Sequence, residues 1–398
     1  MKTIEEAREI LCRQVEQLNE WEEIPLQEAV GRVLAKTQTA LFDQPPFPRS
    51  PLDGYAVKGK ETTDASKENP VELKVIGKVY AGSVFEGVVG EGEAVRIMTG
   101  APIPEGADTV IRQEDTDEGI EMVNIYRGSK SYQNYCPQGE DYKAGTEILP
   151  KGTYIDGVAL AVLASLGITK VPVIRQPRVA VLSTGDEVVQ PGSSLLPGKI
   201  YDANLHYILG RMVEIGKMMP TPAHCDDNLE DIVRTIKHLA EEMDVIITTG
   251  GVSVGEKDLM HGVVETLGAE RLFWRVSLKP GAPTLAAVYQ GTLIICLSGN
   301  PFGAAANFEL LVRPVLAKLT GNDNWKMKRV EAVLEGNSPK KGGVRRFMRG
   351  NYSFGRAQIS GGNHASGALS SMLGCNGLIE IAEDQEAKEG DRVWVHLL

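Results

Sequence analysis

This 398-residue sequence has few cysteines, no excess of basic residues over acidic ones and no long apolar run. The five cysteines are scattered and none forms a C-x-x-C pair, so we expect neither a zinc site nor a disulfide framework, and a cytoplasmic location fits. The net charge of −11 argues against nucleic acid as a partner. No apolar run approaches ~18 residues, and the start, MKTIEEAREI, is too acidic for a signal peptide, so we expect no membrane span.

The N-terminal part combines helical and β patterns. Residues 3–20 predict an amphipathic helix in which Thr3 and Glu6 form a capping box. The proline-rich segment 42–51 marks a domain boundary, and short alternating strands over 55–142 predict a small all-β domain. A second helix is expected within 146–168, capped by Asp156. We expect the two helices to pack together, with the β domain inserted between them.

From residue 171 the pattern changes to alternating strands and helices. This alternation over about 150 residues predicts a doubly wound α/β sheet with helices on both faces. Asp226 or Asp227 is expected to cap the helix at 229–243. The predicted strands are 179–183, 245–249, 272–277 and 293–297, and the predicted helices are 203–215, 229–243, 259–267 and 302–319.

The stretch 244–258, DVIITTGGVSVGEKD, is the centre of the prediction. A buried strand ends in a glycine-rich loop that enters a helix, and such loops bind phosphate or another oxyanion through backbone N–H groups. Glu256 and Asp258 lie at the same loop, where carboxylates make sense if a divalent metal bridges them to the anion. The alternative is that Asp258 only caps the following helix.

Polar loops follow each predicted strand of the α/β region. Because ligands of such sheets bind outside the carboxyl ends of the strands, we expect these loops to share one site, although each alone also fits an ordinary turn or cap. The expected substrate-binding residues are Thr184, Gly185, Asp202, Asn204, Gly250, Gly251, Ser253, Gly255, Lys279, Gly299, Asn300 and Pro301.

Two sets of residues outside the α/β region have open interpretations. Asp53, Thr99 and Asp141 lie in loops of the β region, where each is by itself more often part of a turn than of a site. The C-terminal residues 326–398 predict short strands. A basic cluster there is usually a solvated face, with a second anion contact as the alternative; it comprises Lys340, Lys341, Arg345, Arg346 and Arg349.

Several of these segments, in this order, resemble the MoeA family of molybdopterin molybdenumtransferases, which is related to the gephyrin E domain. The resemblance covers essentially the whole chain. It rests on PLDGYAV (51–57), RIMTGAPIP (96–104), GED (139–141), STGDE (183–187), YDAN (201–204), TTGGVSVGEKD (248–258), KPG (279–281) and SGNP (298–301).

The resemblance implies a multidomain α/β and β protein. Its expected domains are a helical dimerisation domain (1–44 and 143–170), an inserted β domain (45–142), a doubly wound molybdopterin-binding domain (171–321) and a C-terminal β-barrel-like domain (322–398). It also implies a homodimer with a cleft shared between subunits, and the upstream molybdopterin adenylyltransferase as a partner.

The implied reaction inserts molybdate into adenylylated molybdopterin and hydrolyses the phosphate–AMP anhydride in the presence of Mg²⁺. We expect Glu187 and Asp258 to bind the metal and Lys279 to contact the substrate. By motif position, the residues that match the family's functional residues are Asp53, Thr99, Asp141, Glu187, Asp226 and Asp258.

The chain also departs from the common family pattern near the expected anion site. These departures leave two alternatives open: a tungstate-specific insertase or a cofactor-binding scaffold without turnover. The doubly wound domain itself leaves a third, a nucleotide pyrophosphatase like the competence-damage proteins. The departures are Arg275, Ala282, Ser298 and Gly303, together with Cys136-Pro137-Gln138 before the GED motif.

Overall fold

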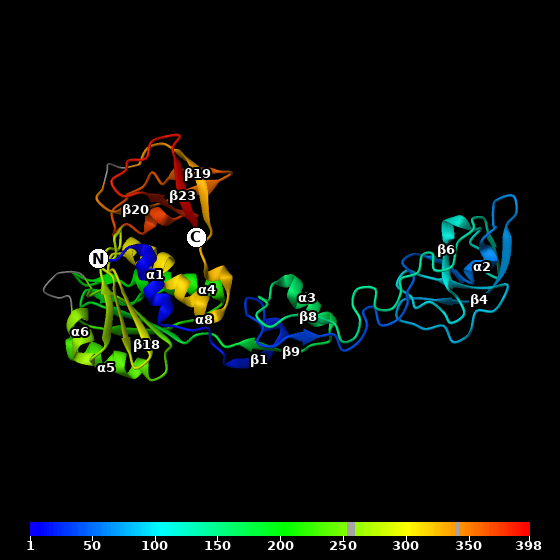
Figure 1. Ribbon diagram of the computed structural model, residues 1–398, viewed down its shortest axis with the longest axis horizontal. Helices are drawn as coiled ribbons and strands as arrows, with labels where there is room; N and C mark the ends of the chain where they lie inside the picture. The colour runs from blue at the N-terminus through cyan, green and yellow to red at the C-terminus, as the bar shows by residue number, and fades with distance from the viewer. Residues whose placement is uncertain (253–258, 339–341) are drawn as a thin grey trace. The chain divides into compact units, whose positions relative to one another are not determined.

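The computed structural model describes residues 1–252, 259–338 and 342–398, and the chain divides into two compact units (Figure 1). The first unit comprises residues 1–36, 152–160 and 169–398, and the second comprises 37–151 and 161–168. Within the described residues, no helix is long and apolar enough to cross a membrane. The two units differ from the four predicted domains, whose boundaries remain a prediction.

The first unit contains the predicted doubly wound sheet. Alternate residues of its strands face opposite sides, so that Val179 and Val181 lie in one hydrophobic core and Ala180 and Leu182 in another. Helices α5 and α6 cover the second core, and α1, α4, α7 and α8 cover the first. In sheet order the strands are β13 (Thr221–Cys225), β10 (Val179–Thr184), β14 (Val245–Thr249), β18 (Thr292–Leu297), β17 (Leu285–Tyr289) and β15 (Glu270–Trp274).

Two strands of this sheet, β13 and β17, were absent from the prediction. β13 is a largely exposed edge strand with a proline, so it lacks the apolar run of a central strand. β17 is antiparallel to both β18 and β15, so β15 runs in the same direction as β18. The loop that follows β15 therefore lies at the carboxyl edge of the parallel strands, as predicted. β15 itself ends at Trp274, earlier than expected.

The helices of the sheet lie where the sequence predicts them, but the cap of α5 does not. The Asn228 side chain accepts hydrogen bonds from the Glu230 and Asp231 amides, so the prediction that Asp226 or Asp227 caps this helix is wrong. A π-helical turn separates α7 from α8. The bounds are α4 Ala203–Gly216, α5 Leu229–Ala240, α6 Met260–Leu267, α7 Pro301–Asn307, η3 Phe308–Val312 and α8 Arg313–Thr320.

Helix α1 (Ile4–Arg13) has the predicted Thr3–Glu6 capping box but ends well before residue 20. Its apolar face packs into the core of the α/β sheet beside α8, so the expectation that it packs on the helix at 146–168 is wrong. That second helix is α3 (Gly157–Ser165), and Asp156 caps it by accepting the Ala159 amide at 2.8 Å, as predicted. The reason for the difference is that the sheet leaves an apolar surface that α1 covers.

The C-terminal part of the first unit is a β-barrel. Strand β20 pairs with both β21 and β22, and the remaining pairings close the ring through β19 and β23. A short strand of the α/β domain, β16 (Leu278–Lys279), adds in parallel to β20. The barrel strands are β19 (Arg329–Glu335), β20 (Arg345–Ser353), β21 (Arg356–Ile359), β22 (Gly377–Ile381) and β23 (Arg392–Leu397).

The second unit contains the predicted small β domain. Five strands form one sheet with a hydrophobic core on each face. In sheet order these are β6 (Thr109–Arg112), β3 (Gly54–Val57), β5 (Glu93–Ile97), β4 (Val71–Val79) and β7 (Met122–Ile125). Strands β3 and β5 are neighbours, which brings the residue before β3 and the loop after β5 together.

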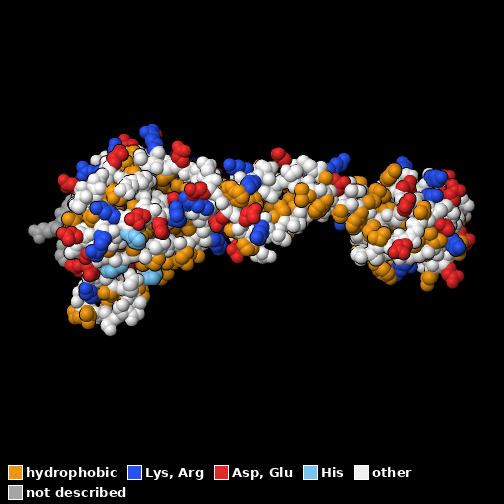
Figure 2. All heavy atoms as spheres, turned by 90° about the horizontal axis from the view of Figure 1, so that it is seen from below, with side chains coloured by type: hydrophobic (Ala, Val, Ile, Leu, Met, Phe, Trp, Pro, Cys, Tyr) orange, Lys and Arg blue, Asp and Glu red, His pale blue; other side chains and the backbone are white. Residues whose placement is uncertain are grey.

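The remaining short elements lie outside these three sheets. In the first unit, two strands form an antiparallel pair: β1 (Trp21–Pro25) and β9 (Lys170–Ile174). In the second unit, β2 (Gln38–Thr39) pairs with β8 (Glu147–Leu149), and α2 (Gly59–Thr62) follows β3. On the face shown in Figure 2, acidic and basic side chains are mixed along the surface.

Candidate functional site

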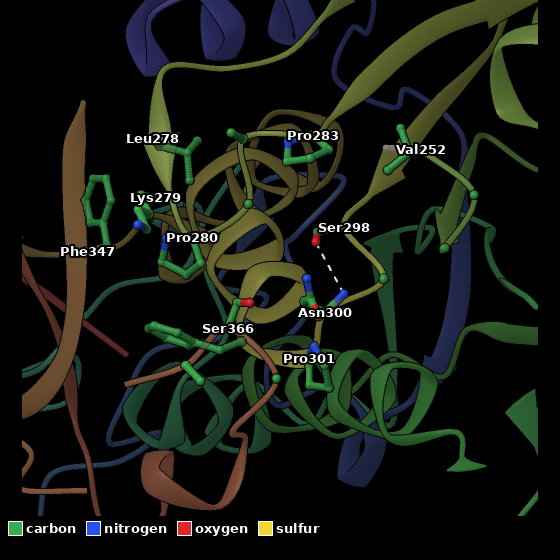
Figure 3. A pocket seen from close by; sticks show the side chains of 18 of the residues that line it. Val252, Leu278, Lys279, Pro280, Pro283, Ser298, Asn300, Pro301, Phe347 and Ser366 are labelled. Atoms are coloured by element: carbon green, nitrogen blue, oxygen red, sulfur yellow. Dashed lines mark hydrogen bonds between the residues drawn. The ribbon is translucent and has the colours of Figure 1, made fainter. Parts of the chain in front are cut away.

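A cavity of about 1320 Å³ lies in the first unit, where the carboxyl edge of the sheet meets the barrel (Figure 3). Its size is above the usual range for a small-molecule site, so it has room for a large substrate. Four of the predicted loops line it. The predicted residues at the cavity are Thr184, Gly185, Glu187, Gly250, Gly251, Lys279, Gly299, Asn300 and Pro301.

The glycine at position 250 is required by the close approach of two loops. Gly250 has φ +101°, and a Cβ there would lie 2.6 Å from the Thr184 carbonyl oxygen. A larger residue would separate the loop after β14 from the loop after β10. The backbone of both loops can therefore lie against the same part of a ligand, as a phosphate-binding loop requires.

The loop that carries Lys279 is held in place by hydrogen bonds to Thr284 and Asn307. The carbonyl oxygen of Gly281 (φ +96°) accepts hydrogen bonds from the Thr284 hydroxyl at 2.8 Å and from the side-chain Nδ2 of Asn307 at 3.1 Å. On its other side, Lys279 pairs in register with Arg346 through the β16–β20 ladder. Lys279 and Arg346, one from each domain, are therefore backbone neighbours that both line the cavity, where cationic side chains favour an anionic ligand.

The loop between β18 and α7 is held by two hydrogen bonds to other elements. The Asn204 side chain donates to the Gly299 carbonyl oxygen at 2.8 Å, so Asn204 orients the loop from helix α4. The Phe302 amide donates to the Ser366 carbonyl oxygen at 2.8 Å, which joins the start of α7 to the barrel. Neither Asn204 nor Asp202 lines the cavity; Asp202 instead caps α4 by accepting the Leu205 amide at 3.0 Å.

The barrel contributes cavity residues that the sequence did not predict. They come from β20 and from the segment that precedes η5 (Ser370–Met372). The composition of residues 360–371, SGGNHASGALSS, is a polar loop signal that could have indicated them. The barrel residues at the cavity are Val344, Arg346, Phe347, Met348, His364, Ala365, Ser366 and Gly367.

Two members of the basic cluster, Arg346 and Arg349, do not lie on a solvated face. Arg346 is 7% exposed and lies at the cavity, and Arg349 is fully buried, with its guanidinium 3.7 Å from the Phe302 ring centroid. Arg349 also donates to the carbonyl oxygens of Ala365 and Ala368, so it holds the segment that lines the cavity. Lys340 and Lys341 lie outside the described residues.

Two predicted acidic residues, Asp226 and Asp258, are not among the described residues that line the cavity. Asp227, not Asp226, lines the cavity; the Asp226 side chain is 77% exposed and lies 3.7 Å from His224 Nε2. The predicted Ser253, Gly255 and Asp258, with Glu256, lie outside the described residues. Among the described residues, no group of three or more acidic, histidine or cysteine side chains forms a ready-made metal site.

In the second unit, the structure brings Asp53 and Thr99 together. Asp53 Oδ1 accepts hydrogen bonds from the Thr99 hydroxyl at 2.6 Å and from the Thr99 amide at 2.7 Å. These two bonds stabilise the carboxylate and hold the pKa of Asp53 below its ordinary value. Asp141 is exposed, and its amide donates to the Gln44 carbonyl oxygen at 2.9 Å.

The Asp53 bonds give a pH-dependent prediction. Replacing Thr99 with valine removes the hydroxyl donor, so the pKa of Asp53 should rise toward its ordinary value. If the reaction needs ionised Asp53, the acidic limb of the pH–rate profile should then move to higher pH, with little change near pH 8. A profile measured from pH 4 to 9 checks this. Thr99→Ser, which keeps the hydroxyl, should follow the wild-type profile; a coinciding profile for Thr99→Val would contradict the expectation.

Comparison with known proteins identifies the family. Three sequence profiles match in order: the MoeA N-terminal region (domain I and II) at residues 2–167, a probable molybdopterin-binding domain at 180–318, and the MoeA C-terminal region (domain IV) at 331–398. The chain belongs to the MoeA family of molybdopterin molybdenumtransferases.

Relatives and solved structures agree with this assignment. The molybdopterin molybdenumtransferases of Staphylococcus epidermidis and Bacillus subtilis are each 37% identical to this MoeA-family chain, over 90% and 87% of it and over 86% and 81% of their own lengths. A crystal structure of the MoeA molybdopterin biosynthesis protein of Pyrococcus horikoshii is 32% identical, covers 100% of both chains and has a TM-score of 0.84. The cavity lies within the parts matched by the second and third profiles.

Proposed function

We propose that this chain inserts molybdate into adenylylated molybdopterin and releases AMP, and that the cavity between the sheet and the barrel is where it does so. The observation that carries the proposal is the pairing of Lys279 with Arg346 at the mouth of the glycine-rich loops. Molybdate and a pyrophosphate are both oxyanions, and adjacent cations with backbone donors are the groups that hold them.

The residues at the cavity divide into two chemical kinds. Lys279 and Arg346 neutralise anionic oxygens, while Gly250 and Gly251 let the backbone approach the substrate phosphates closely. Water cleaves the anhydride to give AMP and the pterin phosphate, and the two dithiolene thiols bind molybdenum while one oxo ligand of molybdate leaves as water with their protons. Lys279 is exposed at the cavity, so its flexible side chain can keep its ammonium group near the anionic oxygens during both steps.

Magnesium fits the acidic residues of the cavity. Glu187 and Asp227 offer carboxylate oxygens on two neighbouring loops and would hold the ion, since Mg²⁺ commonly takes only one or two carboxylates and keeps several waters. When bound, the ion would neutralise charge on the phosphate oxygens. Glu187 and Asp258 remain the proposed ligands from the sequence, and Asp227 joins them because it lines the cavity.

We further propose that the active protein is a cytoplasmic homodimer, and that Asp53, Thr99 and Asp141 of one subunit complete the cavity of the other. This proposal rests on the family that the whole chain matches. The proposed source of the substrate is the molybdopterin adenylyltransferase that precedes this step.

AMP release from adenylylated molybdopterin tests the function directly. Purified protein with Mg²⁺ is assayed with molybdate, with tungstate and with neither oxyanion. Release that depends on molybdate is the expected result. Equal release with tungstate would contradict the choice of metal. Tight substrate binding without AMP release would favour the scaffold alternative, and hydrolysis of free ADP-ribose would favour the pyrophosphatase.

A further inference from the structure

Ser298 lies at the start of the loop between β18 and α7, and its hydroxyl has unused donor capacity. The residue is 6% exposed and lines the cavity. Its Oγ accepts a hydrogen bond from the Asn300 amide at 3.3 Å (Figure 3), which leaves the hydroxyl proton available. In the part of the chain that the structure describes, no protein acceptor is found for that proton.

The space occupied by this hydroxyl explains the glycine at position 303. A Cβ at Gly303 would lie 2.8 Å from Ser298 Oγ, 3.0 Å from Ser298 Cβ and 3.4 Å from Gly281 Cα. The first distance is shorter than real side chains show, so any side chain at 303 would displace the hydroxyl. Glycine inside a helix is normally unfavourable, and here the close contact with Ser298 accounts for it. Ser298 and Gly303 are thus one steric pair.

The first turn of α7 has few amides available for a ligand. Pro301 has no N–H group, the Phe302 amide donates to the Ser366 carbonyl oxygen at 2.8 Å, and the Ala304 amide donates to the Asn300 carbonyl oxygen at 2.9 Å. The start of this helix therefore cannot supply the usual set of donors to an anion. A side-chain donor at this wall of the cavity has to replace them.

We propose that Ser298 is a substrate-binding residue whose hydroxyl donates to an oxygen of the tetrahedral oxyanion substrate, and that Gly303 is required for this contact. The inference rests on the proposed function, because it takes the oxyanion to be molybdate or the pterin phosphate. It assigns the serine and the glycine of this chain a joint role: the glycine keeps open the position from which the serine reaches the ligand that Lys279 attracts.

The test measures KM for molybdate and for adenylylated molybdopterin separately. Ser298→Ala should raise one of the two KM values by roughly 10-fold or more, the usual loss for a hydrogen bond to a charged group. Gly303→Ala should raise the same KM, because the new methyl group displaces the hydroxyl. The double variant should be no worse than Ser298→Ala, since both changes remove one contact. The KM that rises identifies the oxyanion.

Matched controls separate this role from folding. Gly210→Ala adds a methyl group within helix α4 where nothing lies within 4 Å, so both KM values should stay at the wild-type level. Unchanged KM values in Ser298→Ala, with or without a lower melting temperature, would overturn the proposal, because Ser298 would then only support the Asn300 amide.

A binding measurement separates failure of this inference from failure of the proposed function. Equilibrium dialysis with molybdate alone and with inorganic phosphate alone compares the wild type with Ser298→Ala. If the wild type binds the anions but releases no AMP, the proposed function is refuted, while the comparison of anion binding between the wild type and Ser298→Ala still tests the role of Ser298. Equal dissociation constants for both anions, or no binding by the wild type, would overturn the role of Ser298.

Discussion

Replacement of Asp53 with asparagine is expected to lower kcat for AMP release by about 10²–10⁴-fold, the range for loss of a positioned acid–base or charge-stabilising group. Asp53 is a predicted functional residue by its motif position, and two hydrogen bonds from Thr99 hold the pKa of its carboxyl group below the ordinary value. An asparagine Oδ1 can still accept both bonds, so the loop should keep its conformation. The loss should therefore appear in kcat and not in the melting temperature.

Asp117 offers a matched control in the same unit. It also accepts several hydrogen bonds, from the Asn124 amide at 2.9 Å, the Asn124 side chain at 2.8 Å and the Gly119 amide at 3.2 Å, and its pKa is also lowered. These partners form a turn between β6 and β7. Asp117→Asn should leave kcat within about twofold of the wild type. Equal losses in both variants would mean that Asp53 acts only through the fold of the β domain.

The largest expected effect on stability comes from Glu309, which is fully buried in the π-helical turn. Its carboxylate accepts hydrogen bonds from Arg211 Nε at 2.6 Å, Arg313 Nη1 at 2.7 Å and the Tyr207 hydroxyl at 2.8 Å. Glu309→Gln leaves two arginines without their common anion. We expect the free energy of unfolding to fall by about 3–5 kcal/mol, measured by urea denaturation.

The exposed ion pair between Glu335 and Arg356 is the control for this prediction. Its atoms lie 2.8 Å apart, but the side chains are 41% and 70% exposed, so Glu335→Gln should cost only about 0–1 kcal/mol. Similar losses in the two variants would contradict a special role for the buried cluster. Because Arg211 and Asn204 are on the same helix, Glu309→Gln should also loosen the Asn204 contact to the Gly299 loop.

Sequence reasoning predicted the α/β part of the site well because one topological rule governs it. Strand β14 has the predicted bounds, and the loops after β10, β14, β15 and β18 meet at one edge because their strands point the same way. The glycine at 250 was predicted for a phosphate loop, and its close approach to Thr184 gives the reason.

The parts that were not predicted depend on contacts between segments far apart in the chain. The polar composition of residues 360–371 indicates a loop there, but nothing local in His364 or Ser366 indicates that this loop faces the sheet. Likewise, the apolar face of α1 does not specify which surface covers it. The difference between Asp226 and Asp227 is one of direction: adjacent residues in a loop point to different sides, and only the path of the backbone decides which one reaches the cavity.

The parallel pairing of β16 with β20 has a consequence for mechanics. Main-chain hydrogen bonds, and not flexible side-chain stems, set how far apart Lys279 and Arg346 start, so like charges are held across the seam between two domains. Any displacement of β20 relative to the α/β domain would therefore directly change the spacing of these two residues at the cavity.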